Sequence, residues 1–274
     1  MYRLTYAIIT MAVTFMAASP VMADQLADIQ AKGEIVCGTI GTVPPFSFQD
    51  PETRSTAGYD VDICNLIADA IGVKSSIVLV AGAARIPELN QGRLDIVTGT
   101  LGWTLERARQ VDYSQSYFYS NQKVGVLENA GINAIAELKG KRVSAQSAST
   151  SEAIAKEKLP DTEVVSFQDV PQALLALNQG RVSGLVLSEL MLRDFAAASV
   201  GTNTALKVLD DSTLMVEKMG VGVRKGEKTL LDKVNETLTA ADADGRLDAI
   251  YDKWFGKDSK FKMPRSFKVA PIEG

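Results

Sequence analysis

The sequence contains no histidine among its 274 residues. Histidine is the usual base of Ser-His-Asp and Cys-His catalytic sites and the commonest protein ligand of transition metals. The chain also lacks a Walker-type phosphate loop, a Gly-x-Ser-x-Gly elbow and a G-x-G-x-x-G fingerprint. These absences exclude the common hydrolase and nucleotide-dependent designs. We therefore predict that the protein is not an enzyme and holds neither a cofactor nor a metal.

Positive charge is scarce as well. The chain has 29 Lys and Arg against 33 Asp and Glu, which gives a formal net charge of −4. Nucleic-acid phosphates demand clustered Lys and Arg, so we expect no nucleic-acid partner. Beyond the first 23 residues no apolar run approaches the ~20 residues that a membrane-spanning helix needs.

The N-terminus has the pattern of a cleaved secretory signal. Arg3 is its only charge, an apolar run follows from Leu4 to Ala18, and small residues appear at 21–23. We expect residues 1–23 to be removed on export to the periplasm, which leaves a net charge of about −5 because one basic residue is lost.

Only two cysteines are present, Cys37 and Cys64. An exported pair can form a disulfide. Cys37 lies in a strand-like run and Cys64 in a helix-like one, where each can also serve as a small buried apolar residue. The sequence leaves both alternatives open.

Alternating helical and strand patterns predict an α/β protein. The first long helix is expected to begin at an N-cap Asp60 and end at Gly72, and Ser151 is the expected N-cap of a helix in the second half. Strand followed by helix and strand builds a parallel sheet. The strand-like runs lie at 34–39, 73–80, 94–98, 142–145, 162–167 and 182–187.

The pentapeptide Leu-Asn-Gln-Gly-Arg occurs twice, at Leu89–Arg93 and at Leu177–Arg181. Each copy follows a helical pattern and precedes a strand. Glycine adopts the left-handed geometry that ends a helix at little cost. We expect the two copies to mark the same point in two lobes of similar build.

Ligands of open parallel sheets bind beyond the carboxyl ends of the strands. The segments at these points are 39–46, 98–107, 146–152 and 187–189. Most are rich in Gly, Ser and Thr, and 146–152 precedes a helix, whose amides favour an anion. Asp60 and Asp62 point apart on a helix, and helix capping accounts for both.

Taken together, these segments resemble the periplasmic amino-acid-binding proteins of ABC importers, the family 3 extracellular solute-binding proteins, and in particular the receptors for polar and acidic amino acids. The resemblance implies the type II periplasmic-binding-protein fold, in which two parallel-sheet α/β lobes are joined by two crossover strands, with the ligand cleft between the lobes. It rests on the stretches PPFSF, GYDVDICNLIADAIG, RIPELNQGRLDIVTGTLGWTLERARQVDYSQSYF, LKGKRVSAQSASTSEA, LNQGRVSGLVLSE, GVGVRKG and YDKWF.

By this resemblance, Arg107 corresponds to the arginine that clamps the α-carboxylate of the ligand. Thr100 and the backbone at Gly99 and Gly102 match polar contacts of the first lobe. Arg85 matches an arginine before Ile-Pro in receptors similar to those for glutamate and aspartate, and it offers a second anionic contact.

The same resemblance assigns ligand contacts to Ser149 and Thr150, in the carboxylate-binding loop of the second lobe, and to Phe46 in the PPFSF motif. An arginine fork suits a carboxylate, although a lone arginine more often forms a surface ion pair, here with Glu106 or Asp112.

The sequence departs from the family pattern at positions that would contact the rest of the ligand, including its α-ammonium group. Ser188 occupies the position where relatives that bind an α-ammonium usually have Asp, and the neighbouring Glu189 should face away along the strand. Ile40 and Val43 replace charged or aromatic contacts, and Val170 replaces a histidine used by some glutamate receptors. Recognition of an α-ammonium therefore stays open.

We expect a periplasmic binding component of an ABC importer that captures a small carboxylate-bearing solute, most readily a polar or acidic amino acid. The expected partners are this solute and the importer's permease, and we expect the chain to act as a monomer. A receptor for an organic acid without an amino group, a cyclohexadienyl-dehydratase-like enzyme with Glu189 as its acid, and a subunit that presents its ligand to a membrane sensor are the alternatives.

The expected domains are a signal peptide at 1–23, the first part of lobe 1 at 24–121, lobe 2 at 122–220, and a return to lobe 1 with the C-terminal helices at 221–274.

Overall fold

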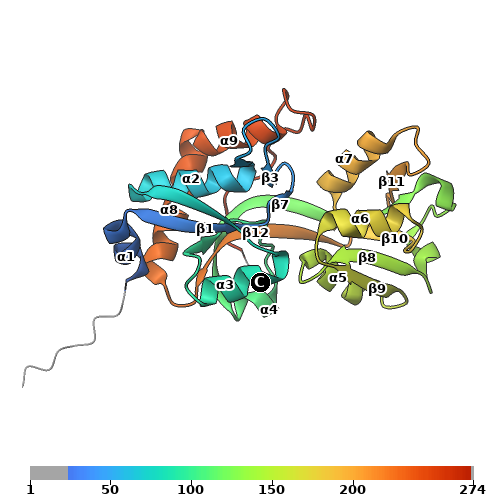
Figure 1. Cartoon of the computed structure of the whole chain (residues 1–274), viewed down its shortest axis with the longest axis horizontal. Helices are drawn as coiled ribbons and strands as arrows, with labels where there is room; N and C mark the ends of the chain where they lie inside the picture. Colours follow the sequence, from blue (N-terminus) through green and yellow to red (C-terminus); the bar gives the residue numbers. More distant parts are fainter. Residues whose placement is uncertain (1–23, 273–274) are drawn as a thin grey trace, which may run out of the picture.

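The computed structural model describes residues 24–272, which form two α/β lobes (Figure 1). The expected signal peptide at 1–23 lies outside the described residues. Within them, no helix is both long and apolar enough to cross a membrane. We call the lobe that contains the N-terminal strand the first lobe and the other the second lobe.

The first lobe is built from two short sheet segments and their covering helices, with a 3-10 turn at Gly82–Ala84. Its elements are α1 (Gln25–Lys32), β1 (Glu34–Thr39), β2 (Thr42–Val43), β3 (Ser47–Gln49), β4 (Thr56–Ala57), α2 (Tyr59–Ile71), β5 (Lys74–Leu79), α3 (Arg85–Asn90), β6 (Ile96–Val97), α4 (Leu105–Ala108), α8 (Lys228–Asp244) and α9 (Arg246–Phe255).

The second lobe repeats the strand–helix alternation after 3-10 turns at Glu128–Ala130 and Ile135–Leu138. Its elements are β8 (Arg142–Gln146), α5 (Thr150–Lys158), β9 (Glu163–Phe167), α6 (Val170–Asn178), β10 (Gly184–Ser188), α7 (Glu189–Ser199) and β11 (Leu206–Val208).

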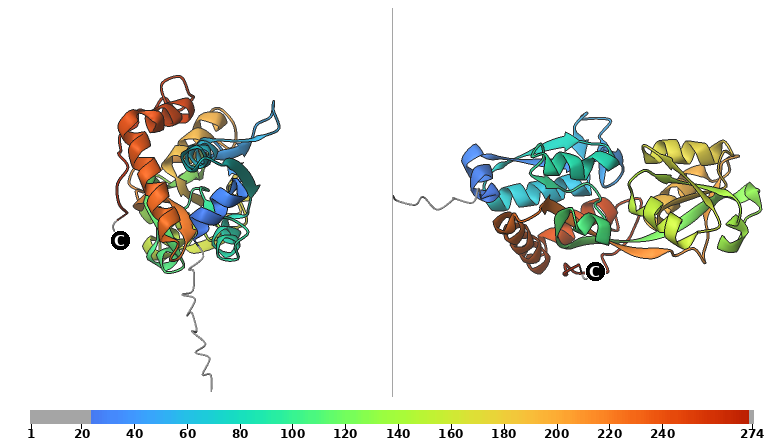
Figure 2. Two further views of the ribbon diagram at one scale, coloured as in Figure 1. Left: turned by 90° about the vertical axis from the view of Figure 1, so that its left-hand side faces the viewer. Right: turned by 90° about the horizontal axis from the view of Figure 1, so that it is seen from below.

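Two long strands, β7 (Val111–Leu127) and β12 (Met215–Arg224), pass between the lobes (Figures 1 and 2). They pair antiparallel with each other, while β12 also pairs with β6 in the first lobe and β7 with β10 in the second. The parallel groups β5-β1-β6 and β10-β8-β9 are thereby joined into one mixed sheet in the order β5-β1-β6-β12-β7-β10-β8-β9. The expected two-lobed α/β fold is confirmed, with its two sheets fused through the crossover strands.

The expected lobe boundaries at 121/122 and 220/221 fall inside β7 and β12. A strand that is shared by both lobes has no natural cut point. The division therefore remains a proposal.

Both copies of the pentapeptide end a helix in the same way. Gly92 and Gly180 have φ of 73° and 67°. Their amides donate to Leu89 O at 3.0 Å and Leu177 O at 2.9 Å. The expected equivalence of the two copies is confirmed, because each glycine turns the chain from α3 or α6 toward the next strand.

Cys37 and Cys64 form a disulfide that joins β1 to α2. Both residues are fully buried, and of the two alternatives left open by the sequence the structure realises the disulfide. The bridge lies wholly within the first lobe.

An aromatic cluster fills the space between α2, α9 and the start of β7. Phe118 lies 4.9 Å from Phe46, 5.1 Å from Phe255 and 5.6 Å from Tyr59 between ring centroids. Such edge-to-face and tilted pairs add to the burial of apolar area. The cluster fixes the PPFSF turn, and with it Phe46, against the first lobe.

Two expected helix caps are wrong. The N-cap of α2 is Gly58, and the cap of α5 is Ser149, whose side chain accepts from Glu152 N. Asp60 is the second residue of α2 and is fully buried, and Ser151 is the second residue of α5. Local sequence identifies capping residues but cannot show that tertiary partners claim their side chains instead.

Candidate ligand-binding site

A cavity of about 50 Å³ lies between the lobes, above the crossover strands. Its volume exceeds the 10–15 Å³ that one water molecule requires. One side is apolar and the other carries hydroxyl, amide and charged groups. It is lined by Ile40, Val43, Phe46, Arg85, Thr100, Gln122, Gln146, Ser149, Thr150, Ser151, Val170, Leu187, Ser188, Met191, Glu217 and Met219.

Six of the nine predicted ligand-binding residues line this cavity: Phe46, Arg85, Thr100, Ser149, Thr150 and Ser188. The other three do not line it but are neighbours of lining residues: Gly99 O accepts from Arg85, Arg107 donates to Thr150, and Gly102 adjoins Glu217.

Arg107 connects the two lobes. It lies in α4, whose N-cap Thr104 accepts from Arg107 N at 3.2 Å. Its guanidinium donates to Gly102 O at 2.7 Å in the first lobe, and to Thr150 Oγ1 at 2.9 Å and Ala148 O at 2.6 Å in the second. The arginine fork thus bonds to the second-lobe loop expected to bind a carboxylate.

Arg85 is almost fully buried at the start of α3, with 3% of its surface exposed. Its Nε donates to Gly82 O at 2.8 Å, and Nη1 donates to Gly99 O at 2.6 Å and Thr100 O at 3.0 Å. Burial, followed by repulsion from Arg107, lowers the pKa of Arg85 to about 10, so it stays cationic at neutral pH. Within residues 24–272, Nε and Nη1 make the hydrogen bonds of this guanidinium and Nη2 makes none.

Asp60 holds the loop at Thr100 in place through a hydrogen bond to its backbone. Its carboxyl accepts from Thr100 N at 2.7 Å and lies 2.8 Å from the hydroxyl of Tyr117, which is also 3.2 Å from Thr98 O. Burial raises the pKa of Asp60 to about 8, against the effect of Tyr117, Thr100 and Arg85. Thr100 has φ of 46°, a conformation uncommon for a residue with a Cβ. The bond to Asp60 helps to hold it.

The loop before α5 presents the N-terminus of that helix to the cavity. Ser149 caps the helix, and Thr150 and Ser151 form its first turn. Backbone N–H groups and the helix dipole at such a point favour an anion. This agrees with the carboxylate site expected there, whose occupancy remains a proposal.

Glu217 was missed by sequence reasoning. It lies on β12, retains 4% of its surface exposed, and accepts a hydrogen bond from Gln122 Nε2. Burial raises the pKa of Glu217, while Thr150, Arg107, Gln122 and Arg85 act in the opposite direction. A signal was available: residues 217, 219, 221 and 223 share one face of the strand, and the last three are Met, Val and Val.

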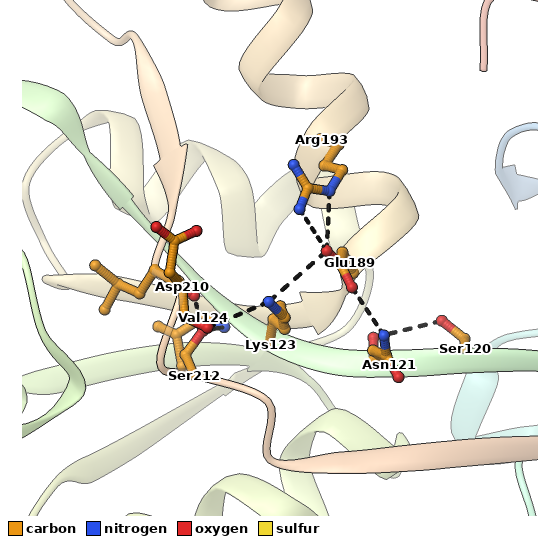
Figure 3. Close-up of polar contacts among 9 residues, drawn as sticks. Ser120, Asn121, Lys123, Val124, Glu189, Arg193, Asp210 and Ser212 are labelled. Carbon is orange, nitrogen blue, oxygen red and sulfur yellow. Dashed lines mark hydrogen bonds and ion pairs between the residues drawn. The ribbon is translucent and has the colours of Figure 1, made fainter. Parts of the chain in front are cut away.

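Ser188 and Glu189 point in different directions. The hydroxyl of Ser188 is buried, lines the cavity and has no hydrogen-bond partner in the described chain. Glu189 instead accepts from Asn121 at 2.9 Å and Arg193 at 2.6 Å, lies 3.7 Å from Lys123 (Figure 3), and lines a different hollow with Asn121 and Arg193. Its side chain faces away from the cavity, as expected.

The apolar side of the cavity contains the three substitutions noted in the sequence, Ile40, Val43 and Val170. Phe46 lies with them. Within residues 24–272, no group of three or more His, Cys, Asp or Glu side chains is placed to hold a metal ion.

The chain is similar in sequence and structure to known bacterial binding proteins. Residues 35–257 match the model of the bacterial extracellular solute-binding proteins, family 3. The chain is 32% identical over 239 residues to the ABC transporter glutamine-binding protein GlnH of Bacillus subtilis (strain 168), with 86% of each chain covered. It is 30% identical over 232 residues to the L-cystine-binding protein TcyJ of Escherichia coli (strain K12), covering 84% of this chain and 85% of that protein.

Among solved structures, the chain is similar to the ancestral amino acid-binding protein AncCDT-1, a precursor of cyclohexadienyl dehydratase. The TM-score is 0.76 and the identity 31%, over 84% of this chain and 99% of the other.

Proposed function

The chain belongs to the bacterial extracellular solute-binding proteins, family 3, and on this premise we propose that it is the periplasmic receptor of an ABC importer for a polar or acidic amino acid. Its fold is that of the type II periplasmic binding proteins. Its named relatives are amino-acid-binding components of ABC transporters. They support the binding of an amino acid for an ABC importer.

The observation that carries the carboxylate part is that Arg85 and the α5 N-terminus line the interlobe cavity, while Arg107 is hydrogen-bonded to Thr150, one of its lining residues. Arg85 offers Nη2, and Thr150 lies at the helix end. A carboxylate placed there would gain charge-assisted hydrogen bonds away from bulk water.

Arg107 suggests how binding and closure are linked. Two of its three hydrogen bonds reach the second lobe, at Thr150 and Ala148. Separation of the lobes would break both bonds and expose the cavity. A ligand that bridges the lobes would add its own bonds to those of Arg107 and favour the closed arrangement.

Arg85 supports an acidic ligand. After Arg107 has paired with one carboxylate, the cavity still contains a buried guanidinium with a free nitrogen. A side-chain carboxylate or amide oxygen of the ligand would satisfy it.

A thermal-shift panel tests the proposal. Purified protein, unfolded and refolded to remove bound solute, is mixed with each of the twenty L-amino acids, with dicarboxylates and with 2-oxo acids. A ligand at 100 times its Kd adds about 2.7 kcal/mol of stability. We expect polar or acidic amino acids to raise the Tm most, and calorimetry then gives Kd. Stabilisation by no amino acid at all would contradict the proposal.

The dehydratase alternative is less well supported. Glu189, the acid considered for it, faces away from the cavity (Figure 3), and the two curated relatives named above are binding proteins. Incubation with prephenate or arogenate, followed by detection of the aromatic product, tests it directly.

A further inference from the structure

The proposed function leaves one buried charge without a role. Among the cavity-lining residues that the structure describes, Glu217 is the only acid. It stands on a strand shared by both lobes, and its side chain enters the cavity from the floor. A buried carboxylate is retained at a cost unless a cation or several hydrogen bonds compensate it.

Glu217 has two hydrogen-bonding neighbours, Gln122 and the hydroxyl of Thr150. The hydroxyl of Ser151 donates to Gln122 Oε1 at 2.6 Å, which turns the Gln122 amide so that its Nε2 donates to Glu217 Oε2 at 2.5 Å. These contacts orient the carboxylate but supply no positive charge.

The other oxygen, Oε1, occupies space that only a glycine leaves open. A Cβ atom added at Gly102 would stand 1.7 Å from Glu217 Oε1 and 2.6 Å from Thr150 Oγ1. The carboxylate therefore lies against the loop that bears Arg107, beside the expected carboxylate site.

The nearby cations do not pair with it directly. Arg85 lines the same cavity and Arg107 bonds to Thr150, and both influence Glu217 electrostatically. No Lys or Arg nitrogen within residues 24–272 forms an ion pair with Glu217 at 4.0 Å or less. Asp60, the other buried acid nearby, is occupied by Thr100 N and Tyr117. Glu217 is thus the acid available to a cationic group of the ligand.

We propose that Glu217 accepts the ammonium group of the bound amino acid, with the unpartnered hydroxyl of Ser188 as a second acceptor in the same cavity. The inference rests on the proposed function and names the side chain that recognises the amino group, which organic acids without an amino group do not have. The ammonium partner thus comes from a crossover strand, and the arginines remain for carboxylates.

The test compares amino acids with analogues that lack only the amino group. Calorimetry on the refolded protein uses L-glutamate with glutarate, L-glutamine with glutaramate, L-serine with 3-hydroxypropanoate and L-alanine with propanoate. For the pair with the tightest amino acid, we expect the wild type to prefer that amino acid by at least 30-fold. In Glu217→Gln the amino acid should lose at least 30-fold in affinity, since one partner of a buried charge pair is removed. The analogue should bind unchanged or more tightly.

Glu189→Gln is the matched control, because it makes the same chemical change outside the cavity and should preserve the preference. A purely structural role for Glu217 predicts equal losses for amino acid and analogue, and that result overturns the inference while the proposed function stands. If the wild type binds no amino acid, the proposed function itself has failed.

Two further measurements keep the inference testable if Glu217→Gln folds poorly. The first is the preference of the wild type for an amino acid over its analogue, which needs no substitution. If an amino acid binds but is not preferred, the inference is contradicted while the proposed function stands. Ser188→Asp, introduced into Glu217→Gln, places a carboxylate in the same cavity and should restore at least 10-fold of the lost affinity. Failure of this restoration in a double variant with a wild-type-like circular dichroism spectrum counts against ammonium recognition at this end of the cavity.

Discussion

Arg107 of the first lobe donates a hydrogen bond of 2.9 Å to the hydroxyl of Thr150, the first residue of α5 in the second lobe. The bond joins the two lobes at Thr150, which also lines the cavity. Its integrity should therefore depend on whether the lobes are together or apart.

Arg107→Ala should weaken ligand binding strongly. It removes the proposed carboxylate contact and both bonds to the second lobe, which we expect to cost about 2–5 kcal/mol, or roughly 30-fold or more in Kd. Calorimetry with the best ligand of the panel measures the effect. Arg109→Ala, an exposed arginine two residues away, is the control, and unchanged affinity in Arg107→Ala would reject the clamp.

Asp60 should make the stability of the ligand-free protein depend on pH. Its pKa is raised by burial to about 8 in the folded state, whereas an unfolded Asp ionises near 3.8. Between these values the folded state retains a proton that the unfolded state has lost, so the free energy of unfolding falls as the pH rises from about 4 to about 8.

Asp60→Asn should flatten this slope, because the amide presents the same donor and acceptor positions to Tyr117 and Thr100 without titrating. Urea unfolding at pH 5, 6.5 and 8 measures the change. Asp62→Asn, in the same helical turn, should keep the wild-type slope. A wild-type slope in Asp60→Asn would show that another group titrates.

Gly102→Ala should destabilise the protein through a clash with Glu217. The added Cβ would approach Oε1 to 1.7 Å, and overpacking of this kind typically costs about 1–3 kcal/mol. The double variant Gly102→Ala/Glu217→Ala removes the obstructing carboxylate. A double-mutant cycle from urea unfolding should give a favourable coupling between the two sites, and strict additivity would contradict their contact.

Loss of the disulfide should lower stability without abolishing ligand binding. Cys37 and Cys64 are separated by 27 residues in sequence, and closure of a loop of that size contributes about 3–4 kcal/mol in the chain-entropy description. Unfolding of Cys37→Ala/Cys64→Ala in urea measures the loss. Reduction of the wild type by dithiothreitol is the control, because it breaks the disulfide without removing side-chain atoms from the core. It should also lower the free energy of unfolding.

The sequence predicted the elements whose signals are local. Gly92 and Gly180 mark helix ends that the structure reproduces, and the apolar runs predicted the parallel strands along the chain but not their order in the sheet. The carboxyl ends of those strands predicted the segments 98–107 and 146–152, and the family resemblance named Thr100 and Thr150 within them; both line the cavity.

The sequence could not reveal contacts that depend on the tertiary arrangement. Asp60 was read as a cap because its partners, Tyr117 and Thr100, lie 57 and 40 residues away in sequence. Gln122 and Glu217 were overlooked because ligand sites were sought only beyond strand ends, and these residues lie within strands that cross between the lobes.

The crossover strands both line the cavity and join the two lobes. Gln122 and Glu217 form part of the cavity floor, yet β7 and β12 are also the spans through which one lobe is attached to the other. A substitution at Gln122 or Glu217 therefore changes both the groups that contact a solute and the strands about which the lobes move. If the chain is the proposed receptor, we therefore expect selectivity and the rate of release to be coupled, so that a variant selected for a new solute through these positions also has a changed residence time.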